Sequence, residues 1–341
     1  MSSRSSRPSD PNPARKAGEH LTMADLAELA GVSAITVSRA LRDSPLVNPE
    51  TRAKIKELAE QQGYQFNISA RNLRLRRSMT VAVVVEMKPT VERQMSGSYP
   101  LDLLGGISQE LTSAGYSVLL TSLQGGALPS VQAADGVILL GQGAHEDAMH
   151  EVQRWGRPMV VWGAVSRHET QVVVGSDNHR GGKLAAERFL ALGRRRPVFL
   201  GDSAHGEFAE RLEGFTETLA EHGIVPLTPN VANFTVSAGA QAVHQLLDEH
   251  PQFDALFAAS DLLAIGAIRA LIERGRRVPE DVSVIGYDDT PLGATYLPPL
   301  TSIHQNFVDA GVSLARKILA MIEGRPAQSE ILPTHLVARV T

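Results

Sequence analysis

The sequence predicts an all-α helix-turn-helix head followed by a larger α/β domain with parallel sheets. Two observations indicate this fold class. Between Thr22 and Gly63 short helical segments follow one another with tight turns, whereas from Met79 onward short apolar strands alternate with amphipathic helices. The length agrees with this division, because 341 residues with 43% apolar side chains exceed one typical domain.

Two short helices at the start of the head are separated by a tight turn. Thr22 can cap the first helix, and Gly31 suits the left-handed position that ends it. Ser33 can cap a second helix at once, so the turn has only about three residues. The small side chains of Ala27 and Ala30 allow the helices to cross closely, which predicts a helix-turn-helix.

A third helix is predicted from Asn48 as its cap and Pro49 as its first residue. Apolar side chains from all three helices can then close a small core: Leu26, Val37, Leu41, Ile55, Leu58 and Ala59.

This arrangement leaves the outer face of the second helix free for contact. In a helix-turn-helix, residues near the start of this helix reach base edges in the major groove. Arg39 can bind a guanine with two hydrogen bonds, Thr36 and Ser38 can bind a phosphate or a base, and Ala34 or Ile35 can contact a thymine methyl group. The alternative is a three-helix bundle with a purely structural role.

Charge is distributed unevenly along the chain. The first 78 residues contain 13 Lys and Arg against 8 Asp and Glu, and the remainder contains 20 against 29. The positive end is therefore the one expected to meet a polyanion.

A basic segment follows the three helices. Asn67 can cap a short helix there, and Ala70 is small enough for close contact between helices. Leu73 lies among four arginines, where an apolar side chain fits a wedge inserted into a minor groove while the arginines hold phosphates. The alternative is a flexible basic linker.

Composition excludes several other kinds of protein. The chain has no cysteine, which rules out disulfides and thiolate chemistry and is consistent with a reducing cytosol. Residues 1–20 are rich in Ser, Pro and Arg and lack the apolar stretch of a secretory signal, so a disordered tail is expected. No apolar run is long enough to cross a bilayer, and a soluble cytoplasmic protein is expected.

The larger domain shows regular strand and helix alternation. The expected strands are Thr80 to Val85, Tyr116 to Thr121, Gly136 to Leu140, Pro158 to Trp162, Pro197 to Gly201, Ala255 to Ala258 and Val282 to Ile285. The helical stretches include Leu103 to Ala114, Gly181 to Leu192, Gly206 to Gly223 and Asp261 to Arg274. Such alternation predicts parallel sheets with right-handed crossovers and ligands beyond the carboxyl ends of the strands.

Catalytic motifs are missing from this domain. Lys183 follows a glycine but has neither the earlier glycine nor the following Ser or Thr of a phosphate loop. No nucleophile elbow is present, and His145 and His150 are five residues apart, off a common helical face. We therefore expect no enzyme, no cofactor and no metal site.

The head resembles the LacI/GalR family of transcriptional regulators. The resemblance rests on the run from Thr22 to Ser33, on Thr36 to Arg39, on Val47 to Arg52, and on Gly63-Tyr64 with Ala70-Arg71 and Leu73. It implies that two heads bind a near-palindromic operator as a dimer, with Leu73 opening the central base step. By the same resemblance, Thr22, Ser33, Asn67 and Ala70 are expected to contact DNA together with the residues of the second helix. Phe66 departs from the family pattern, which usually has a proline before the hinge helix.

The resemblance extends over residues 79 to 341. Its strongest motifs are Asp177-Asn178 with Gly181-Gly182, Arg211 with Gly214-Phe215, Ser260 to Ala267, Arg277 to Asp289, and Pro298 to Ile303. It implies a two-lobe, periplasmic-binding-protein-like effector domain with crossovers near Asp177, Ile303 and Pro333. The lobes are expected to contain about 79–177 with 304–332, and about 178–303 with 333–341.

The same resemblance implies an effector site built from Arg211, Phe234, Ser260 and Asp288. An Arg and a carboxylate can bind vicinal hydroxyls while an aromatic ring covers the apolar face of a sugar or a base. Asp288 can equally cap a turn, and Phe234 can equally belong to the core.

Two further candidates lie at the ends of predicted strands, since Glu86 directly follows the first and Trp162 is the last residue of the fourth. Glu86 stands where the family often has a small polar residue, and Gly163 stands where an Asp is frequent, so the effector can be unusual.

The sequence therefore predicts a homodimeric, sequence-specific DNA-binding regulator, most simply a repressor controlled by a small molecule such as a carbohydrate. The expected domains are 21–66 for the head, 67–78 for the hinge and linker, and 79–341 for effector binding and dimerisation. A nucleobase-type corepressor, a solute-binding protein and a non-specific architectural DNA protein remain as alternatives.

Overall fold

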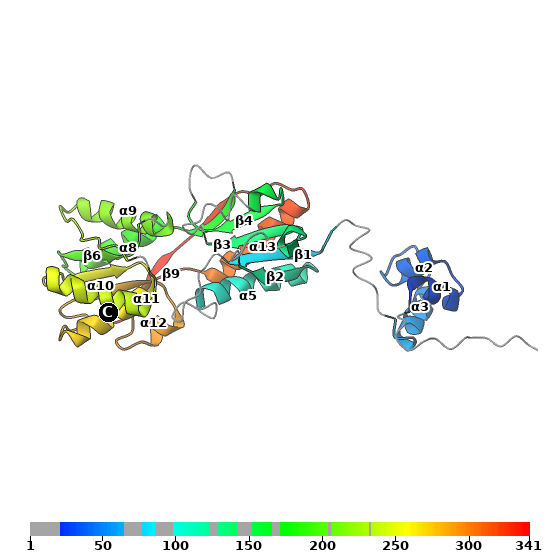
Figure 1. The fold of residues 1–341 in the computed structure, drawn as a ribbon, viewed down its shortest axis with the longest axis horizontal. Coiled ribbons are helices and arrows are strands. Elements are labelled where there is room, and N and C mark those ends of the chain that lie inside the picture. Colours follow the sequence, from blue (N-terminus) through cyan, green and yellow to red (C-terminus); the bar gives the residue numbers. More distant parts are fainter. Residues whose placement is uncertain are drawn as a thin grey trace, which may run out of the picture. The chain divides into compact units, whose positions relative to one another are not determined.

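The computed structural model describes residues 21–64, 77–85, 98–122, 129–141, 152–165, 171–203, 206–231 and 233–341. The chain forms two compact units, Met1–Arg76 and Arg77–Thr341 (Figure 1). The expected tail of residues 1–20, the hinge residues Asn67, Ala70 and Leu73, and Glu86 lie outside the described residues.

The N-terminal unit contains three short helices, α1 (Met23–Ala30), α2 (Ala34–Ala40) and α3 (Pro49–Gln61). Each begins at the predicted cap, and Gly31 ends α1 with the left-handed φ of 66°. The buried side chains form one small core: Leu26, Ala27, Val37, Ala40, Val47, Ile55 and Ala59. Leu41 and Leu58 are only partly buried at its edge.

The first sheet of the C-terminal unit is six-stranded and entirely parallel, with the order β10-β5-β4-β3-β1-β2. Its strands are β1 (Thr80–Val85), β2 (Ser117–Thr121), β3 (Gly136–Leu140), β4 (Met159–Trp162), β5 (Val172–Ser176) and β10 (Glu330–Leu332). Helices α5 (Ser98–Ser113) and α13 (Phe307–Ile322) pack together against one face. The short α6 (Pro129–Gln132) contributes to the core on the opposite face.

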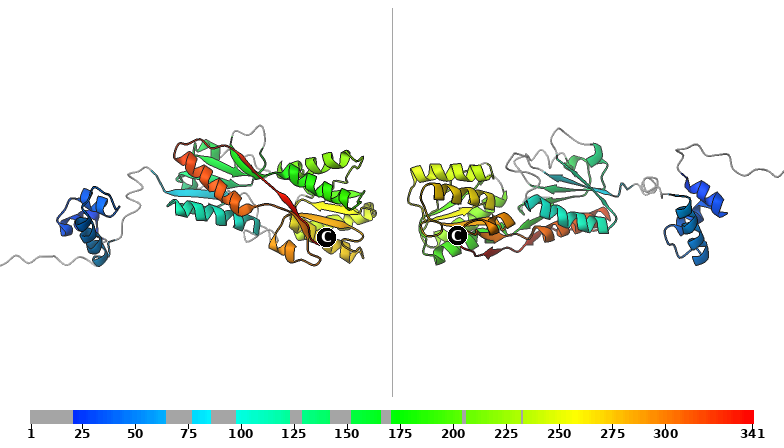
Figure 2. Two further views of the ribbon diagram at one scale, coloured as in Figure 1. Left: turned by 180° about the vertical axis from the view of Figure 1, so that it is seen from behind. Right: turned by 90° about the horizontal axis from the view of Figure 1, so that it is seen from below.

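The second sheet is five-stranded, with the order β11-β9-β8-β7-β6. Four strands are parallel, β6 (Pro197–Leu200), β7 (Ala255–Ala258), β8 (Ser283–Asp288) and β9 (Thr301–His304), and the edge strand β11 (His335–Val337) is antiparallel to β9. On one face lie α8 (Asn178–Ala191) and α9 (Gly206–Ala220), and on the other α10 (Val236–Glu249) and α11 (Asp261–Glu273) (Figures 1 and 2). The short α12 (Pro291–Thr295) follows β8.

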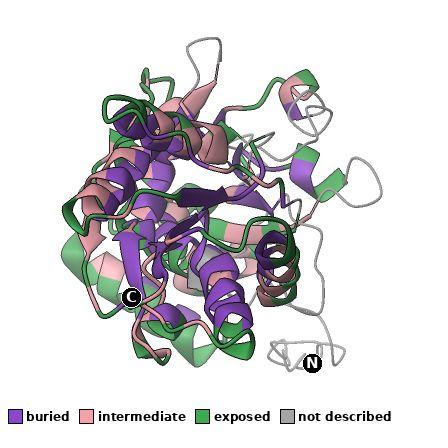
Figure 3. Cartoon of the chain, turned by 90° about the vertical axis from the view of Figure 1, so that its left-hand side faces the viewer, coloured by how far each residue is buried: buried purple, intermediate pink, exposed green. Residues whose placement is uncertain are grey.

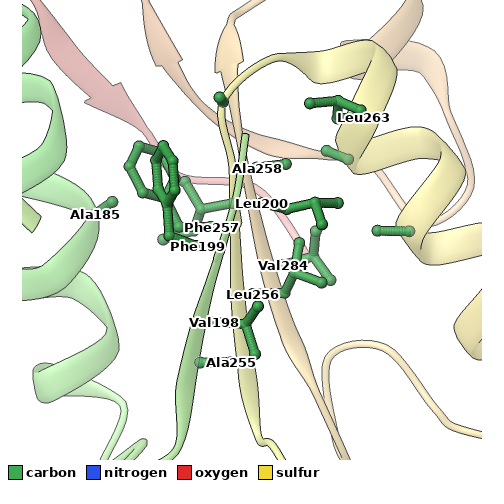
Figure 4. Packing of buried hydrophobic residues seen from close by; sticks show 14 of the residues in the cluster. Ala185, Val198, Phe199, Leu200, Ala255, Leu256, Phe257, Ala258, Leu263 and Val284 are labelled. Carbon is green, nitrogen blue, oxygen red and sulfur yellow. The ribbon is translucent and has the colours of Figure 1, made fainter. Parts of the chain in front are cut away.

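Apolar side chains fill both faces of this second sheet. Figure 4 shows Ala185 of α8 and Leu263 of α11 on opposite sides of the strands, with Phe199 and Phe257 between the sheet and α8. Figure 3 shows that buried residues lie on the strands and on the inward faces of the helices. Burial of both sheet faces explains the continuous apolar strands of the sequence.

Three connections join the two sheets. The chain passes from β5 to α8 at Asp177, from β9 to α13 at Gln305 and Asn306, and from β10 to β11 at Pro333 and Thr334. Because β9 extends to His304, the second connection begins after that residue. No described helix is long and apolar enough to span a membrane.

Candidate functional site

One face of α2 is turned away from the core of the N-terminal unit. Val37 and Ala40 are buried, whereas Ala34, Ile35 and Arg39 are exposed, with Ile35 at 64%. The spacing separates the two sets, because residues three or four apart lie on the same side of a helix. The outer face therefore combines apolar contact groups with one guanidinium group.

Among the described residues, no hydrogen bond or ion pair engages the Arg39 side chain. The neighbouring Arg42 differs, since its guanidinium group donates to the carbonyl oxygen of Ser38 at 2.9 Å and to Ser38 Oγ at 3.0 Å. Arg39 is thus the cation of α2 that is available to an external acceptor.

The hydroxyl groups predicted to meet DNA also cap helices. Thr22 Oγ1 accepts from the Asp25 amide at 3.3 Å, and Ser33 Oγ accepts from the Thr36 amide at 3.2 Å. The Ser33 and Thr36 hydroxyls are also 2.9 Å apart, within hydrogen-bonding distance. Thr22 and Ser33 remain exposed, although the Thr22 amide and hydroxyl group both donate to the Asp25 carboxylate at 2.8 Å.

In the C-terminal unit, Arg211 of α9 is the centre of a second polar cluster. It is only 4% exposed, and its Nε donates to Asn178 Oδ1 at 2.9 Å. Its Nη1 donates to the Ala259 carbonyl at the end of β7. The guanidinium group stacks over the Tyr287 ring at 3.6 Å and lies 4.8 Å from the Phe208 centroid.

Two glycines of α8 make this arrangement possible. A Cβ at Gly181 would lie 2.3 Å from the Tyr287 hydroxyl, and one at Gly182 would lie 1.9 Å from the Arg211 carbonyl oxygen. The close approach of α8 and α9 brings Asn178, just beyond the first connection, to the guanidinium group.

Asp288 ends β8 in the same region. Its backbone has a φ of 105°, and Gln305 Nε2 donates to its Oδ1 at 2.7 Å. Removal of water by the surrounding protein raises the pKa of Asp288 to about 7, although the charge of Arg211 opposes the shift. The fully buried Asp261 fixes the next turn, because it accepts from the Thr290 amide at 2.7 Å.

Glu210 is a second titratable carboxyl group near Arg211. Desolvation raises its pKa to about 7, partly opposed by a hydrogen bond from Asn178 and by the charge of Arg211. Two carboxyl groups with raised pKa values therefore flank one buried guanidinium group.

The structure connects four of the predicted effector residues. Phe234 is 7% exposed and its ring lies 4.5 Å from that of Phe208, which in turn contacts Arg211. Ser260 follows Ala259, but its Oγ caps α11 by accepting from the Leu263 amide at 3.3 Å. Its hydroxyl group is engaged as an acceptor but can still donate, so contact with an effector stays a prediction.

Trp162 lies at the end of β4 in the first sheet, whereas Arg211 and Asp288 belong to elements of the second sheet. It is 3% exposed, and its ring meets Phe307 edge-to-face at 6.0 Å. It thus has the environment of a core residue next to the second connection.

Three members of the cluster were not among the predicted effector residues, although the first two lie in motifs that carry the resemblance: Asn178, Tyr287 and Gln305. The available signal was their position, since each lies at the end of a strand or directly after one. No group of three or more metal-binding side chains occurs in the described parts of the chain.

The fold and the two sites define a class of protein. The chain has a helix-turn-helix with a free outer face, and it is joined to an α/β unit with a polar cluster where the two sheets connect. This combination defines a DNA-binding regulator with a ligand-binding module.

Comparison with known proteins agrees with this class. Residues 22–67 match the model for bacterial regulatory proteins of the lacI family, and residues 186–341 match that for a periplasmic binding protein-like domain. The HTH-type transcriptional regulator CelR of Thermobifida fusca is 35% identical over 332 residues, which cover 93% of this chain and 97% of CelR. The chain belongs to the LacI family of transcriptional regulators.

Two solved structures extend the comparison over nearly the whole chain. The CelR–cellobiose complex is 31% identical with a TM-score of 0.67, covering 94% of this chain and 99% of that one. The lac repressor dimer bound to operator and the anti-inducer ONPF is 27% identical with a TM-score of 0.82, covering 95% and 99%. These relatives are transcriptional regulators.

Proposed function

We propose that the protein is a homodimeric repressor whose affinity for a near-palindromic operator is set by a carbohydrate effector. The observation that carries the proposal is the exposed outer face of α2, with Arg39 free of partners among the described residues. We assign 21–66 to DNA binding, 67–78 to the hinge and 79–341 to effector binding and dimerisation, and we place the activity in the cytoplasm.

Recognition of DNA follows from the chemistry of that face. The Arg39 guanidinium group matches the O6 and N7 acceptors of guanine, and Ala34 or Ile35 can contact a thymine methyl group. The exposed Thr22 and Ser33 hydroxyls, at two helix N-termini, suit phosphate oxygens. We assign supporting roles to the remaining predicted DNA-binding residues, Thr36, Ser38, Asn67, Ala70 and Leu73.

The polar cluster of the C-terminal unit suits an uncharged polyol. Asp288 can accept hydrogen bonds from hydroxyl groups, Arg211 can donate them, and the Phe234 ring can cover an apolar sugar face. The related CelR has been solved as a complex with cellobiose, which supports a carbohydrate for this chain. Glu86, Trp162 and Ser260 remain secondary candidates for effector contact.

Control of DNA binding is proposed to pass through the three connections between the sheets. An effector bound beside Asn178 and Gln305 touches the residues at which two of them begin, so it can favour one arrangement of the sheets over another. A coupling of about 1–3 kcal/mol is typical and changes operator affinity several-fold to about a hundredfold.

The experiment begins with selection of an operator by the full-length protein from a random duplex library, followed by gel shifts at several salt concentrations. Tight binding to the selected duplex and weak, strongly salt-dependent binding to scrambled DNA are expected. Equal affinity for both duplexes would refute the proposal.

A thermal-shift panel on the full-length protein then tests the effector. It compares cellobiose and other neutral sugars with sugar phosphates and nucleobases. We expect a neutral sugar to stabilise the protein and also to change its operator affinity. A response to nucleobases alone would mean that the effector is a nucleobase and not a carbohydrate.

A further inference from the structure

The first residues of the C-terminal unit are held by one buried carboxylate. Asp135 lies in the turn before β3 and is 9% exposed. Its Oδ1 accepts from the Ser78 amide at 2.8 Å and from Ser78 Oγ at 3.1 Å, and its Oδ2 accepts from the Met79 amide at 2.9 Å. Both oxygens are therefore engaged by the segment that leads back to the head.

The same short segment is fixed on its other sides by backbone hydrogen bonds. The Met79 carbonyl accepts from the Ser117 amide at 2.9 Å, and the Asp135 amide donates to the Thr80 carbonyl at 2.9 Å. Met79 also has a φ of 52°, a left-handed conformation that an ordinary side chain adopts only when its surroundings impose it. The two oxygens of Asp135 accept from two consecutive backbone amides, those of Ser78 and Met79. The carboxylate is therefore well placed to impose the turn at Met79.

We propose that Asp135 is a positioning residue that fixes the direction in which the chain leaves the C-terminal unit at Arg77, toward the DNA-binding head. This inference rests on the proposed function. A rearrangement of the six-stranded sheet reaches the linker only if the first residues of the unit follow the sheet. The three hydrogen bonds of Asp135 tie those residues to the turn before β3, one of the central strands. Without them, the Arg77 guanidinium group still donates to the Ile322 carbonyl oxygen at 3.4 Å, but the backbone of Ser78 and Met79 regains rotation and the heads lose a fixed starting direction.

The first test needs neither operator nor effector. Because the chain has no cysteine, Arg77→Cys gives a single site for a nitroxide spin label. It also removes the Arg77 hydrogen bond to the Ile322 carbonyl in every labelled variant alike, so the comparison between variants isolates Asp135. The spectrum should show restricted motion with Asp135 present and clearly faster motion after Asp135→Ala. Asp135→Asn should be intermediate, because its amide keeps one acceptor oxygen and places a donor where the second was. An unchanged spectrum in the Asp135→Ala variant would overturn the proposal.

The second test measures function with the unlabelled full-length protein. Asp135→Ala should weaken binding to the selected operator at least tenfold, while the affinity of the DNA-free protein for its sugar stays within twofold. Asp135→Asn should recover part of the operator affinity.

A matched control separates positioning from general instability. Val137 is fully buried in β3, two residues from Asp135, so Val137→Ala weakens the same sheet without touching the three hydrogen bonds. The two variants are compared when their unfolding midpoints are equal. If Val137→Ala then lowered operator affinity as much as Asp135→Ala, the role of Asp135 would be merely structural. If the wild-type protein selected no operator, the proposed function would fail, whereas the spin-label result would still decide the role of Asp135.

Discussion

At the scale of single residues, the two arginines of the α2 region allow a sharp test of DNA recognition. Arg39→Ala removes the guanidinium group that is free to meet a base. We expect it to cost about 1–3 kcal/mol of discrimination between the selected operator and one with the contacted guanine replaced. Competition gel shifts at fixed salt measure this difference.

Arg42→Ala is the matched control, because it removes the same charge from a side chain already bonded to Ser38. It should weaken binding to all duplexes about equally and leave the discrimination intact. Equal loss of discrimination in both variants would contradict the role assigned to Arg39.

Asp288 predicts a pH dependence of effector binding. Its pKa of about 7 lies above the ordinary value of 3.8. Between these two pH values the folded, effector-free protein keeps a proton on Asp288 that the unfolded chain has lost. The associated stabilisation is complete below about pH 4 and is lost as pH rises through 7. Effector hydroxyl groups that donate to Asp288 favour the ionised form, so sugar affinity should be about tenfold lower at pH 6 than at pH 8.

Titration calorimetry at both pH values measures the effect, and two variants identify the group. Asp288→Asn should bind weakly and without this pH dependence. Glu210 also has a pKa of about 7, so Glu210→Gln must retain the dependence if Asp288 is responsible. A flat profile in Glu210→Gln would assign the titration to Glu210 instead.

At the scale of elements, the contact of α8 with α9 depends on a missing side chain. Gly182→Ala would place a Cβ 1.9 Å from the Arg211 carbonyl oxygen, where only backbone can move aside. We expect the free energy of unfolding to fall by about 1–3 kcal/mol, and sugar affinity to fall because Arg211 shifts. Chemical denaturation and calorimetry measure the two effects.

Gly105 in α5 provides the opposite case, since a Cβ there meets no atom of the described residues within 4 Å beyond its own turn of helix. Gly105→Ala should stabilise by about 0.5–1 kcal/mol, the ordinary gain of alanine over glycine in a helix. If Gly182→Ala and Gly105→Ala changed the free energy of unfolding equally, the close contact of α8 with α9 would not be what distinguishes Gly182 from Gly105.

The sequence predicted those elements whose stability is local. The caps Thr22, Ser33 and Asn48 determine where three helices begin, and the uninterrupted apolar runs of β1 and β3 mark their bounds. Strands β10 and β11 have three residues each and depend on pairing with β5 and β9, which no local pattern shows.

The candidate site shows the same limit. Arg211 and Asp288 followed from motifs that resemble a family, and their chemistry could be named before any coordinates. Asn178 and Gln305 join the site only because distant segments meet there, 33 and 17 residues from their partners along the chain. Ser260 and Trp162 also have local roles that the sequence did not show, a helix cap and an edge-to-face ring contact, and their part in effector binding stays a prediction.

At the scale of the whole molecule, exposed apolar side chains on the C-terminal unit predict where the two copies of the proposed dimer meet. Leu292 and Leu297, in α12 and just after it, are 52% and 80% exposed, and Leu101 of α5 is 50% exposed. Figures 1 and 2 show α5 and α12 along the same side of this unit. A second copy is the expected occupant, because the related lac repressor was solved as a dimer on its operator.

Leu297→Asp tests this surface. In a two-fold interface a carboxylate loses its water without a partner of opposite charge, so the dimer dissociation constant should rise at least tenfold. Sedimentation velocity across a concentration series measures it. Operator affinity should fall with it, since a monomer reaches only one half-site. Val225→Asp is the control, because Val225 is 87% exposed in the segment between α9 and α10 and belongs to neither α5 nor α12. If Leu297→Asp sedimented like the wild-type protein while Val225→Asp dissociated, the dimer would form through the surface around Val225 and not through α5 and α12.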